Sequence, residues 1–88
     1  MEETLNALIV LPTYNEIENL GPMVDAILGL DHGFEILVVD DNSPDGTGDL
    51  ADDLARIHPQ VHVLHRAEKM GLGPAYIEGF EWAMPRHY

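Results

Sequence analysis

The sequence predicts an α/β fold: the N-terminal half of a doubly wound domain, with elements in the order β-α-β-α-β-α and parallel strands. Three short runs have the composition of buried strands, the third being weaker and partly alternating: Ala7–Leu11, Glu35–Asp40 and Val61–His65. After each run, apolar residues recur at helical spacing. Such alternation implies parallel strands that are joined by right-handed helical crossovers.

The first unit contains a polar segment between its strand and its helix. Pro12 follows Ala7–Leu11 and is expected to end that strand. Asn15 is placed to cap the helix that follows. That helix is predicted by the spacing of Ile17, Leu20, Val24 and Ile27. Gly21-Pro22 interrupts the pattern, so we expect either a short turn before a helix from Pro22, or a kink.

The second and third units follow the same plan. Asn42–Gly48 is dense in turn residues and leads into a helix that is closed by His58-Pro59. The apolar face of this helix is formed by Leu50, Leu54 and Ile57. Gly71–Pro74 predicts a loop, and Pro85 is expected to stop the last helix. This last helix is marked by Ile77, Phe80 and Met84.

The composition excludes several classes of protein. Sixteen acidic residues against four basic ones give a net charge of −12, so nucleic acid is not expected as a partner. There is no cysteine to form a disulfide, which fits a reducing cytoplasm. No apolar run approaches the roughly 20 residues of a membrane span, and the first residues do not resemble a signal peptide. We therefore expect a cytoplasmic chain without a transmembrane segment, with a place at the cytoplasmic face of a membrane as the alternative for the intact protein.

The length allows one small domain and no more. Half of a doubly wound sheet leaves a strand edge and parts of both faces without neighbours. Residues 1–88 are therefore expected to form a single, incomplete domain.

Polar residues follow the first two strands at the edge of the sheet where ligands bind in open α/β folds. A nucleotide at this edge needs an acceptor for base N–H groups, an acceptor for ribose hydroxyls and a flat apolar surface. Asp41, Glu16 and Tyr14 can supply these in turn. The alternative is that Glu16 caps a helix and Asp41 forms a turn. Neither the first nor the second predicted strand is followed by G-x-G-x-x-G, which excludes a dinucleotide cradle. No G-K-[ST] occurs, which excludes a P-loop.

Three blocks of the sequence together resemble the inverting family-two glycosyltransferases. They are LPTYNEIENL (Leu11–Leu20), ILVVDDNSPDGTGDLAD (Ile36–Asp52) and VLHRAEKMGLGPAYIEGFEWA (Val63–Ala83). Within that family they are most similar to the dolichol- and polyprenol-phosphate mannose synthases. The resemblance implies a GT-A fold and the transfer of a sugar, mannose from GDP-mannose, to a polyprenyl or dolichyl phosphate.

The resemblance also implies roles for individual residues. The nucleotide-binding positions carry over to Pro12, Tyr14, Glu16, Val39 and Asp41. Asp40 is expected to hold the loop instead of touching the ligand. A structural role is expected for the loop residues Ser43, Asp45, Gly46 and Thr47. Arg66 and Lys69 match basic positions near the diphosphate, with a solvated loop as the alternative.

One part of the family pattern is missing from the 88 residues. The D-x-D motif, which binds a divalent metal such as Mg²⁺ or Mn²⁺, follows the next strand of the family and would lie beyond Tyr88. No metal ligand and no catalytic residue is therefore assigned within this chain. We expect weak nucleotide binding and no turnover by these residues alone.

Three other interpretations remain open. In a receiver domain, Ile36–Asn42 would form the acidic pocket, but Met1–Gly33 would be unexplained and Glu81 would replace the phosphoacceptor aspartate. The spacing of a calcium loop fits Asp41, Ser43, Asp45, Gly46, Asp49 and Asp52. Pro44 and the preceding strand do not fit that loop. The third interpretation is a non-catalytic, truncated fragment.

His62 and His65 are expected on opposite faces of a strand and receive no metal role.

Overall fold

The computed structural model describes residues 7–30, 32–67 and 71–86. Strands and helices alternate along the chain, as predicted. They are β1 (Leu8–Thr13), α1 (Leu20–Leu28), β2 (Glu35–Asp40), α2 (Thr47–Ile57), β3 (Val61–His65) and α3 (Leu72–Ala83), with a short 3₁₀ turn over Met84–Arg86.

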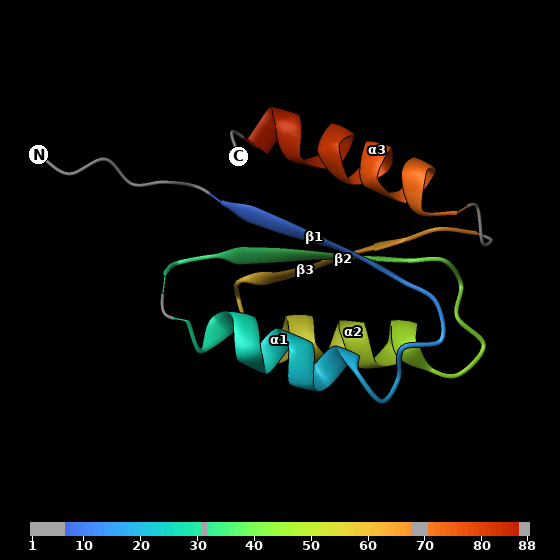
Figure 1. Ribbon diagram of the computed structural model, residues 1–88, viewed down its shortest axis with the longest axis horizontal. Helices are drawn as coiled ribbons and strands as arrows, with labels where there is room; N and C mark the ends of the chain where they lie inside the picture. Colours follow the sequence, from blue (N-terminus) through green and yellow to red (C-terminus); the bar gives the residue numbers. More distant parts are fainter. Residues whose placement is uncertain (1–6, 31, 68–70, 87–88) are drawn as a thin grey trace, which may run out of the picture.

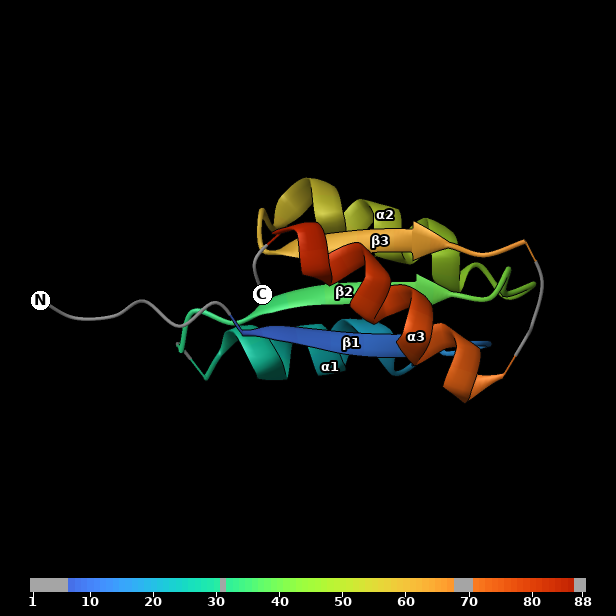
Figure 2. The same ribbon diagram turned by 90° about the horizontal axis from the view of Figure 1, so that it is seen from above.

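The strands form one parallel sheet in the order β1-β2-β3. The register pairs Leu8 with Glu35 at one end of β1 and Thr13 with Asp40 at the other. Helices α1 and α2 cover one face of the sheet and α3 covers the other (Figures 1 and 2). This three-layer arrangement confirms the predicted α/β class.

The central strand β2 divides the core between the two faces. Ile36 and Val38 belong to the core under α1 and α2, with Leu20, Val24, Ala51, Leu54 and Val61. Leu37 and Val39 belong to a second core under α3, with Ala75. All four of these strand residues have no exposed surface, which explains why the run reads as continuously apolar.

Helix α3 lies close to β1 because small residues face the sheet. Ala75, Gly79 and Ala83 are its buried residues. A methyl group added at Gly79 would lie 2.7 Å from the Val10 Cγ1 atom and 3.3 Å from Cγ2. Gly79 therefore sets the distance between the helix and the strand.

Gly79→Ala is expected to make the chain less stable than Gly73→Ala by about 1–3 kcal/mol, the usual cost of overpacking. Both substitutions place alanine in α3, but the position at Gly73 has no atom within 4 Å. Urea unfolding of the two variants measures the difference. Equal midpoints would show that α3 does not pack on Val10 as described.

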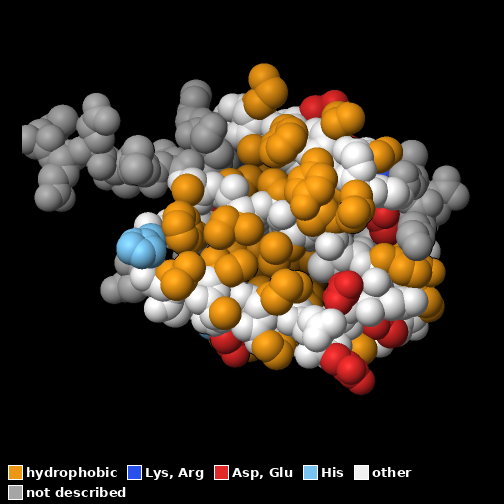
Figure 3. Space-filling model, viewed as in Figure 1, with side chains coloured by type: hydrophobic (Ala, Val, Ile, Leu, Met, Phe, Trp, Pro, Cys, Tyr) orange, Lys and Arg blue, Asp and Glu red, His pale blue; other side chains and the backbone are white. Residues whose placement is uncertain are grey.

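The outer surface of α3 carries several large apolar side chains. Its large exposed side chains are Leu72, Tyr76, Ile77, Phe80 and, directly after the helix, Met84. Figure 3 shows hydrophobic side chains gathered across the face where β1 lies between α3 and α1. Contiguous exposure of this kind is typical of an interface and not of single surface residues.

Two local predictions in the first unit are wrong. Strand β1 does not end before Pro12 but continues to Thr13. Among the described strands, β1 lies at an edge of the sheet, where a proline without an N–H is tolerated. Asn15 does not cap α1, because the residue at the N-cap position is Asn19. The helix begins at Leu20, so Pro22 falls in its first turn, where the missing N–H would have no helical partner.

Candidate functional site

The carboxyl ends of all three strands meet at one edge of the sheet. Beyond the last pair of β1 and β2, the Asp41 N–H donates to the Thr13 carbonyl oxygen at 3.1 Å. The Arg66 N–H donates to the Asp40 carbonyl oxygen at 2.8 Å. These two bonds hold the loops that follow the strands beside one another.

A cleft of about 250 Å³ opens at this edge. Its lining is formed by Pro12, Thr13, Tyr14, Glu16, Asp41, Gly71 and Leu72. The structure therefore brings together four of the five residues that were predicted to hold a nucleotide. Gly71 and Leu72 were not predicted, although their position beyond the end of the third strand is a signal that could have found them.

The fifth predicted residue, Val39, does not line the cleft. Its side chain is fully buried in the core beneath α3. Its contact with a nucleotide base stays a prediction that rests on the family resemblance. Lys69 lies outside the described residues.

Asp40 holds the loop together, as expected. The hydroxyl groups of Thr13 and Ser43 donate to its Oδ1 at 2.8 and 2.7 Å, and the Ser43 N–H donates to its Oδ2 at 3.0 Å. Asp40 is 1% exposed. Three donors thus offset the cost of burying this carboxylate.

The loop after β2 also holds the loop after β1 through two relays of the same form. The Asn15 N–H donates to the Ser43 hydroxyl at 3.0 Å, and that hydroxyl donates to Asp40. The Glu16 N–H donates to the Thr47 hydroxyl at 2.9 Å, and that hydroxyl donates to Asp45. Hydrogen bonds in such chains polarise and strengthen one another. The structural role expected of this loop is confirmed.

The same contacts explain why Asn15 is not a helix cap. Its backbone has φ of 55°, in the left-handed region that asparagine tolerates. The N–H groups of Asn15, Glu16 and Ile17 are bound by side chains of the neighbouring loop, Ile17 by Asp45 Oδ2 at 3.1 Å. These bonds hold Tyr14 and Glu16 outside the helix, at the cleft.

Asp45 makes the stability of this loop pair depend on pH. The Thr47 hydroxyl, followed by backbone N–H groups of Thr47 and Ile17, lowers the pKa of the Asp45 carboxyl. Because the folded-state pKa is depressed, the stabilisation is present above the unfolded value of about 3.9 and is lost as the pH falls through the folded value. Asp45→Asn is therefore expected to cost stability at pH 6 and to cost little near pH 2.5. Urea midpoints at both values test this, and a cost independent of pH would contradict it.

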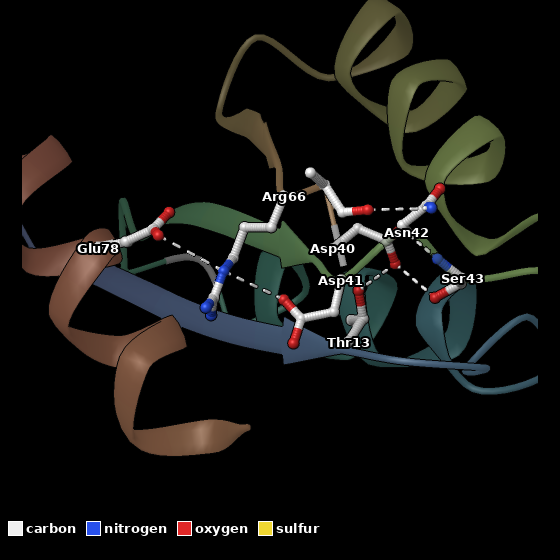
Figure 4. A network of polar contacts seen from close by, with 8 residues as sticks. Thr13, Asp40, Asp41, Asn42, Ser43, Arg66 and Glu78 are labelled. Carbon is white, nitrogen blue, oxygen red and sulfur yellow. Dashed lines mark hydrogen bonds and ion pairs between the residues drawn. The ribbon is translucent and has the colours of Figure 1, made fainter. Parts of the chain in front are cut away.

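Asp41 and Arg66 form a buried ion pair beside the cleft. The Arg66 Nε lies 3.4 Å from Asp41 Oδ1 and 3.6 Å from Oε1 of Glu78 on α3. Figure 4 shows the guanidinium between the two carboxylates. The side chain of Arg66 is only 2% exposed, so the interpretation of Arg66 as part of a solvated loop is wrong. Sequence reasoning did not find the partner Glu78, because the contact depends on how α3 packs.

The described residues do not provide a site for a metal ion. No group of three or more His, Asp or Glu side chains with suitable geometry occurs among residues 7–30, 32–67 and 71–86. Of the calcium-loop residues, Asp41 pairs with Arg66, and Asp45 binds N–H and hydroxyl donors. This donor set therefore does not fit the divalent metal that the resemblance implies.

The histidines of β3 lie on opposite faces of the sheet, as predicted. The His62 Nε2 atom is 2.7 Å from Glu35 Oε1, and its ring contacts Trp82 of α3. The His65 Nε2 atom is 2.8 Å from Asp52 Oδ1 of α2.

None of the helices in the described part of the chain combines the length and the apolarity that a membrane-spanning helix needs.

A parallel sheet with a cleft at its carboxyl ends defines an α/β protein of the doubly wound class. Residues 8–86 match the family described as Glycosyl transferase family 2. The chain therefore belongs to the family-two glycosyltransferases. The receiver interpretation is thereby excluded.

Two curated relatives cover nearly the whole chain. Polyprenol monophosphomannose synthase of Mycolicibacterium smegmatis is 52% identical over 86 residues, which are 97% of this chain and 32% of that protein. Undecaprenyl-phosphate mannosyltransferase of Micrococcus luteus is 53% identical over 88 residues, covering 96% of this chain and 35% of that protein. The chain thus spans about a third of the length of these relatives.

A solved structure has the same fold. The mannosyltransferase PcManGT from Pyrobaculum calidifontis, in complex with GDP-Man and Mn²⁺, has a TM-score of 0.80 and 28% sequence identity to this chain. The match covers 89% of this chain and 24% of the other. This likeness confirms the GT-A type of fold that the sequence predicted.

Proposed function

We propose that the chain is the nucleotide-binding part of a glycosyltransferase that transfers mannose from GDP-mannose to a polyprenyl phosphate. The observation that carries the proposal is the convergence of Tyr14, Glu16 and Asp41 on one cleft at the strand ends. The names of the two curated relatives support mannosyl transfer to a polyprenol carrier. The complex of the structural neighbour with GDP-Man supports the donor.

In the proposed site each group has a separate task. Asp41 accepts N–H groups of the base, and a carboxylate can accept two from guanine, N1–H and N2–H, through its two oxygens. Glu16 accepts ribose hydroxyls, and the half-exposed ring of Tyr14 offers a flat surface to the nucleoside. The cleft thus recognises the leaving group of the reaction.

The reaction itself is an inverting displacement. An oxygen of the polyprenyl phosphate attacks the anomeric carbon of mannose, the bond from that carbon to the diphosphate oxygen breaks, and GDP leaves. Among the described residues, no group of acidic or histidine side chains could hold a metal ion for this step. We therefore propose that the 88 residues bind GDP and do not transfer mannose alone, the metal being held by residues outside this chain.

Titration of the purified chain with GDP and UDP, followed by NMR, tests the recognition. We expect weak, saturable binding that favours GDP, because uracil offers one N–H to Asp41 where guanine offers two. Equal binding of both nucleotides would contradict the guanine assignment, and no binding of either would contradict the proposed function. Incubation with GDP-mannose, Mg²⁺ and a polyprenyl phosphate is expected to give no product, and mannosyl transfer would overturn the proposed inactivity.

A further inference from the structure

Arg66 is a buried cation that the proposed chemistry does not use. Its side chain is 2% exposed, and its three guanidinium nitrogens have no hydrogen-bond partner among the described residues. Its charged neighbours are Asp41, at the cleft, and Glu78, on α3. Burying an arginine in this way is costly, so its position needs a reason beyond packing.

The two adjacent aspartates at the end of β2 are neutralised differently. Asp40 is held by hydroxyl and N–H donors and faces the loops. Asp41 has a cation as its neighbour, and its side chain is 7% exposed although it lines the cleft. A carboxylate this buried needs a positive charge beside it, and in surroundings of low dielectric the attraction is strong. Arg66 supplies that charge.

We propose that Arg66 is the positioning residue for base recognition: its ion pair with Asp41 Oδ1 fixes the plane of that carboxylate toward the cleft. This inference rests on the proposed function, in which Asp41 reads N1–H and N2–H of guanine. Two parallel hydrogen bonds to one carboxylate require a fixed plane, whereas one hydrogen bond tolerates rotation. Arg66 therefore governs discrimination between bases as well as affinity.

Glu78 completes the arrangement from the other side. Its Oε1 atom lies 3.6 Å from the Arg66 Nε. Its side chain is 43% exposed, so Glu78 is the solvated one of the two carboxylates beside Arg66. It ties the guanidinium to α3, and α3 begins at the cleft with Leu72. The cluster thus links the third helix to the base-reading carboxylate.

This role differs measurably from a contact between Arg66 and the diphosphate. If Arg66 contacted the phosphates, its replacement would weaken the binding of GDP but not that of guanosine, which has no phosphate. If Arg66 positions Asp41, its replacement would weaken the binding of guanosine and of GDP alike. It would also reduce the preference for GDP over inosine diphosphate (IDP), whose base lacks only the 2-amino group.

The test is an NMR titration of the 88-residue chain and its Arg66→Met and Arg66→Lys variants with GDP, IDP and guanosine. We expect the unsubstituted chain to prefer GDP over IDP by about tenfold or more, the usual value of a hydrogen bond to a charged group. Arg66→Met should weaken the binding of GDP and of guanosine by similar factors. It should also bring the ratio of the affinities for GDP and IDP close to one. Arg66→Lys, which keeps the charge, should restore much of the ratio.

Arg56→Met is the matched control, because it removes an arginine that is exposed on α2 and pairs with Asp53. It should change neither affinity nor ratio. The proposal is overturned if Arg66→Met keeps the GDP-to-IDP ratio, or if it weakens GDP while guanosine binds normally. If the unsubstituted chain binds guanine nucleotides without preference over IDP, the proposed guanine recognition fails first, and the role of Arg66 fails with it.

A second measurement does not depend on any ligand. Urea unfolding of Arg66→Met, Asp41→Asn and the double variant forms a double-mutant cycle. Arg66→Met should raise the unfolding equilibrium constant strongly when Asp41 is present. In the Asp41→Asn background the same substitution should raise that constant by a factor about tenfold smaller. Additive effects would show that the two side chains are not coupled and would overturn the proposal.

Discussion

Asp41→Ala is expected to weaken GDP binding by about 1–3 kcal/mol, or roughly five- to 150-fold. Among the described residues that line the cleft, Asp41 is the acid that is buried and paired with a cation. Its loss would leave the N–H groups of a bound guanine without their acceptor. A donor that is buried without a partner costs more than the mean strength of a hydrogen bond.

The same NMR titration measures this effect, with Asp25→Ala as the control. Asp25 is an exposed acid on α1, so its removal changes the net charge equally without touching the cleft. Asp25→Ala should leave the dissociation constant within about twofold, because repulsion from exposed charges is screened by salt. If both variants bind GDP as the unsubstituted chain does, Asp41 does not read the base.

Asp40→Ala is expected to lower the free energy of unfolding by about 3 kcal/mol. The carboxylate accepts three hydrogen bonds in a position that is 1% exposed, and bonds to charged groups are worth about 1.5–3 kcal/mol each. Its loss would also leave the Thr13 hydroxyl buried without this acceptor. A domain of this size has a total stability of about 5–15 kcal/mol, so the loss is a large share.

Urea unfolding measures the loss, and Asp40→Asn separates shape from charge. The amide oxygen can still accept from the Thr13 and Ser43 hydroxyl groups, but its NH2 group cannot accept from the Ser43 N–H, so an intermediate loss is expected. GDP binding should weaken in step with stability, because Asp40 and Ser43 hold the Asn15 backbone at the cleft. If Asp40→Ala unfolds at the same urea concentration as the unsubstituted chain, the bonds at the strand ends do not stabilise the fold.

Sequence alone was sufficient to predict the alternation of elements and the cluster at the strand ends. Both follow from rules that act locally or through topology. Parallel strands place their carboxyl ends at one edge, so Tyr14, Glu16 and Asp41 had to approach one another once β1 and β2 were predicted as neighbours.

The errors arise where a distant segment decides the local structure. Asn15 has the composition of a helix cap, but Ser43, 28 residues later, binds its N–H and keeps it out of the helix. Pro12 has the character of a strand terminator, but β1 is an edge strand among those described and tolerates it. Neither outcome is visible in the neighbouring residues.

Arg66 shows the same limit at the site itself. Its sequence neighbours suggest a basic loop, whereas its ion-pair partners lie 25 residues before it and 12 residues after it, at Asp41 and Glu78. The contact with Glu78 exists because α3 begins at the strand ends and runs back over the sheet, whereas Asp41 follows β2, the neighbour of β3 (Figure 1). Only the packing of that helix could reveal the burial of the guanidinium.

The most direct measurement is a map of the amide NMR shifts of the chain as GDP is added. If one cleft at the strand ends binds the nucleoside, the largest changes should fall on Tyr14, Glu16, Asp41 and the start of α3. Residues on the outer surface of α2, such as Asp53, should change little. Saturable changes that centre elsewhere, with Tyr14 and Asp41 unmoved, would contradict the assignment of this cleft as the nucleotide site.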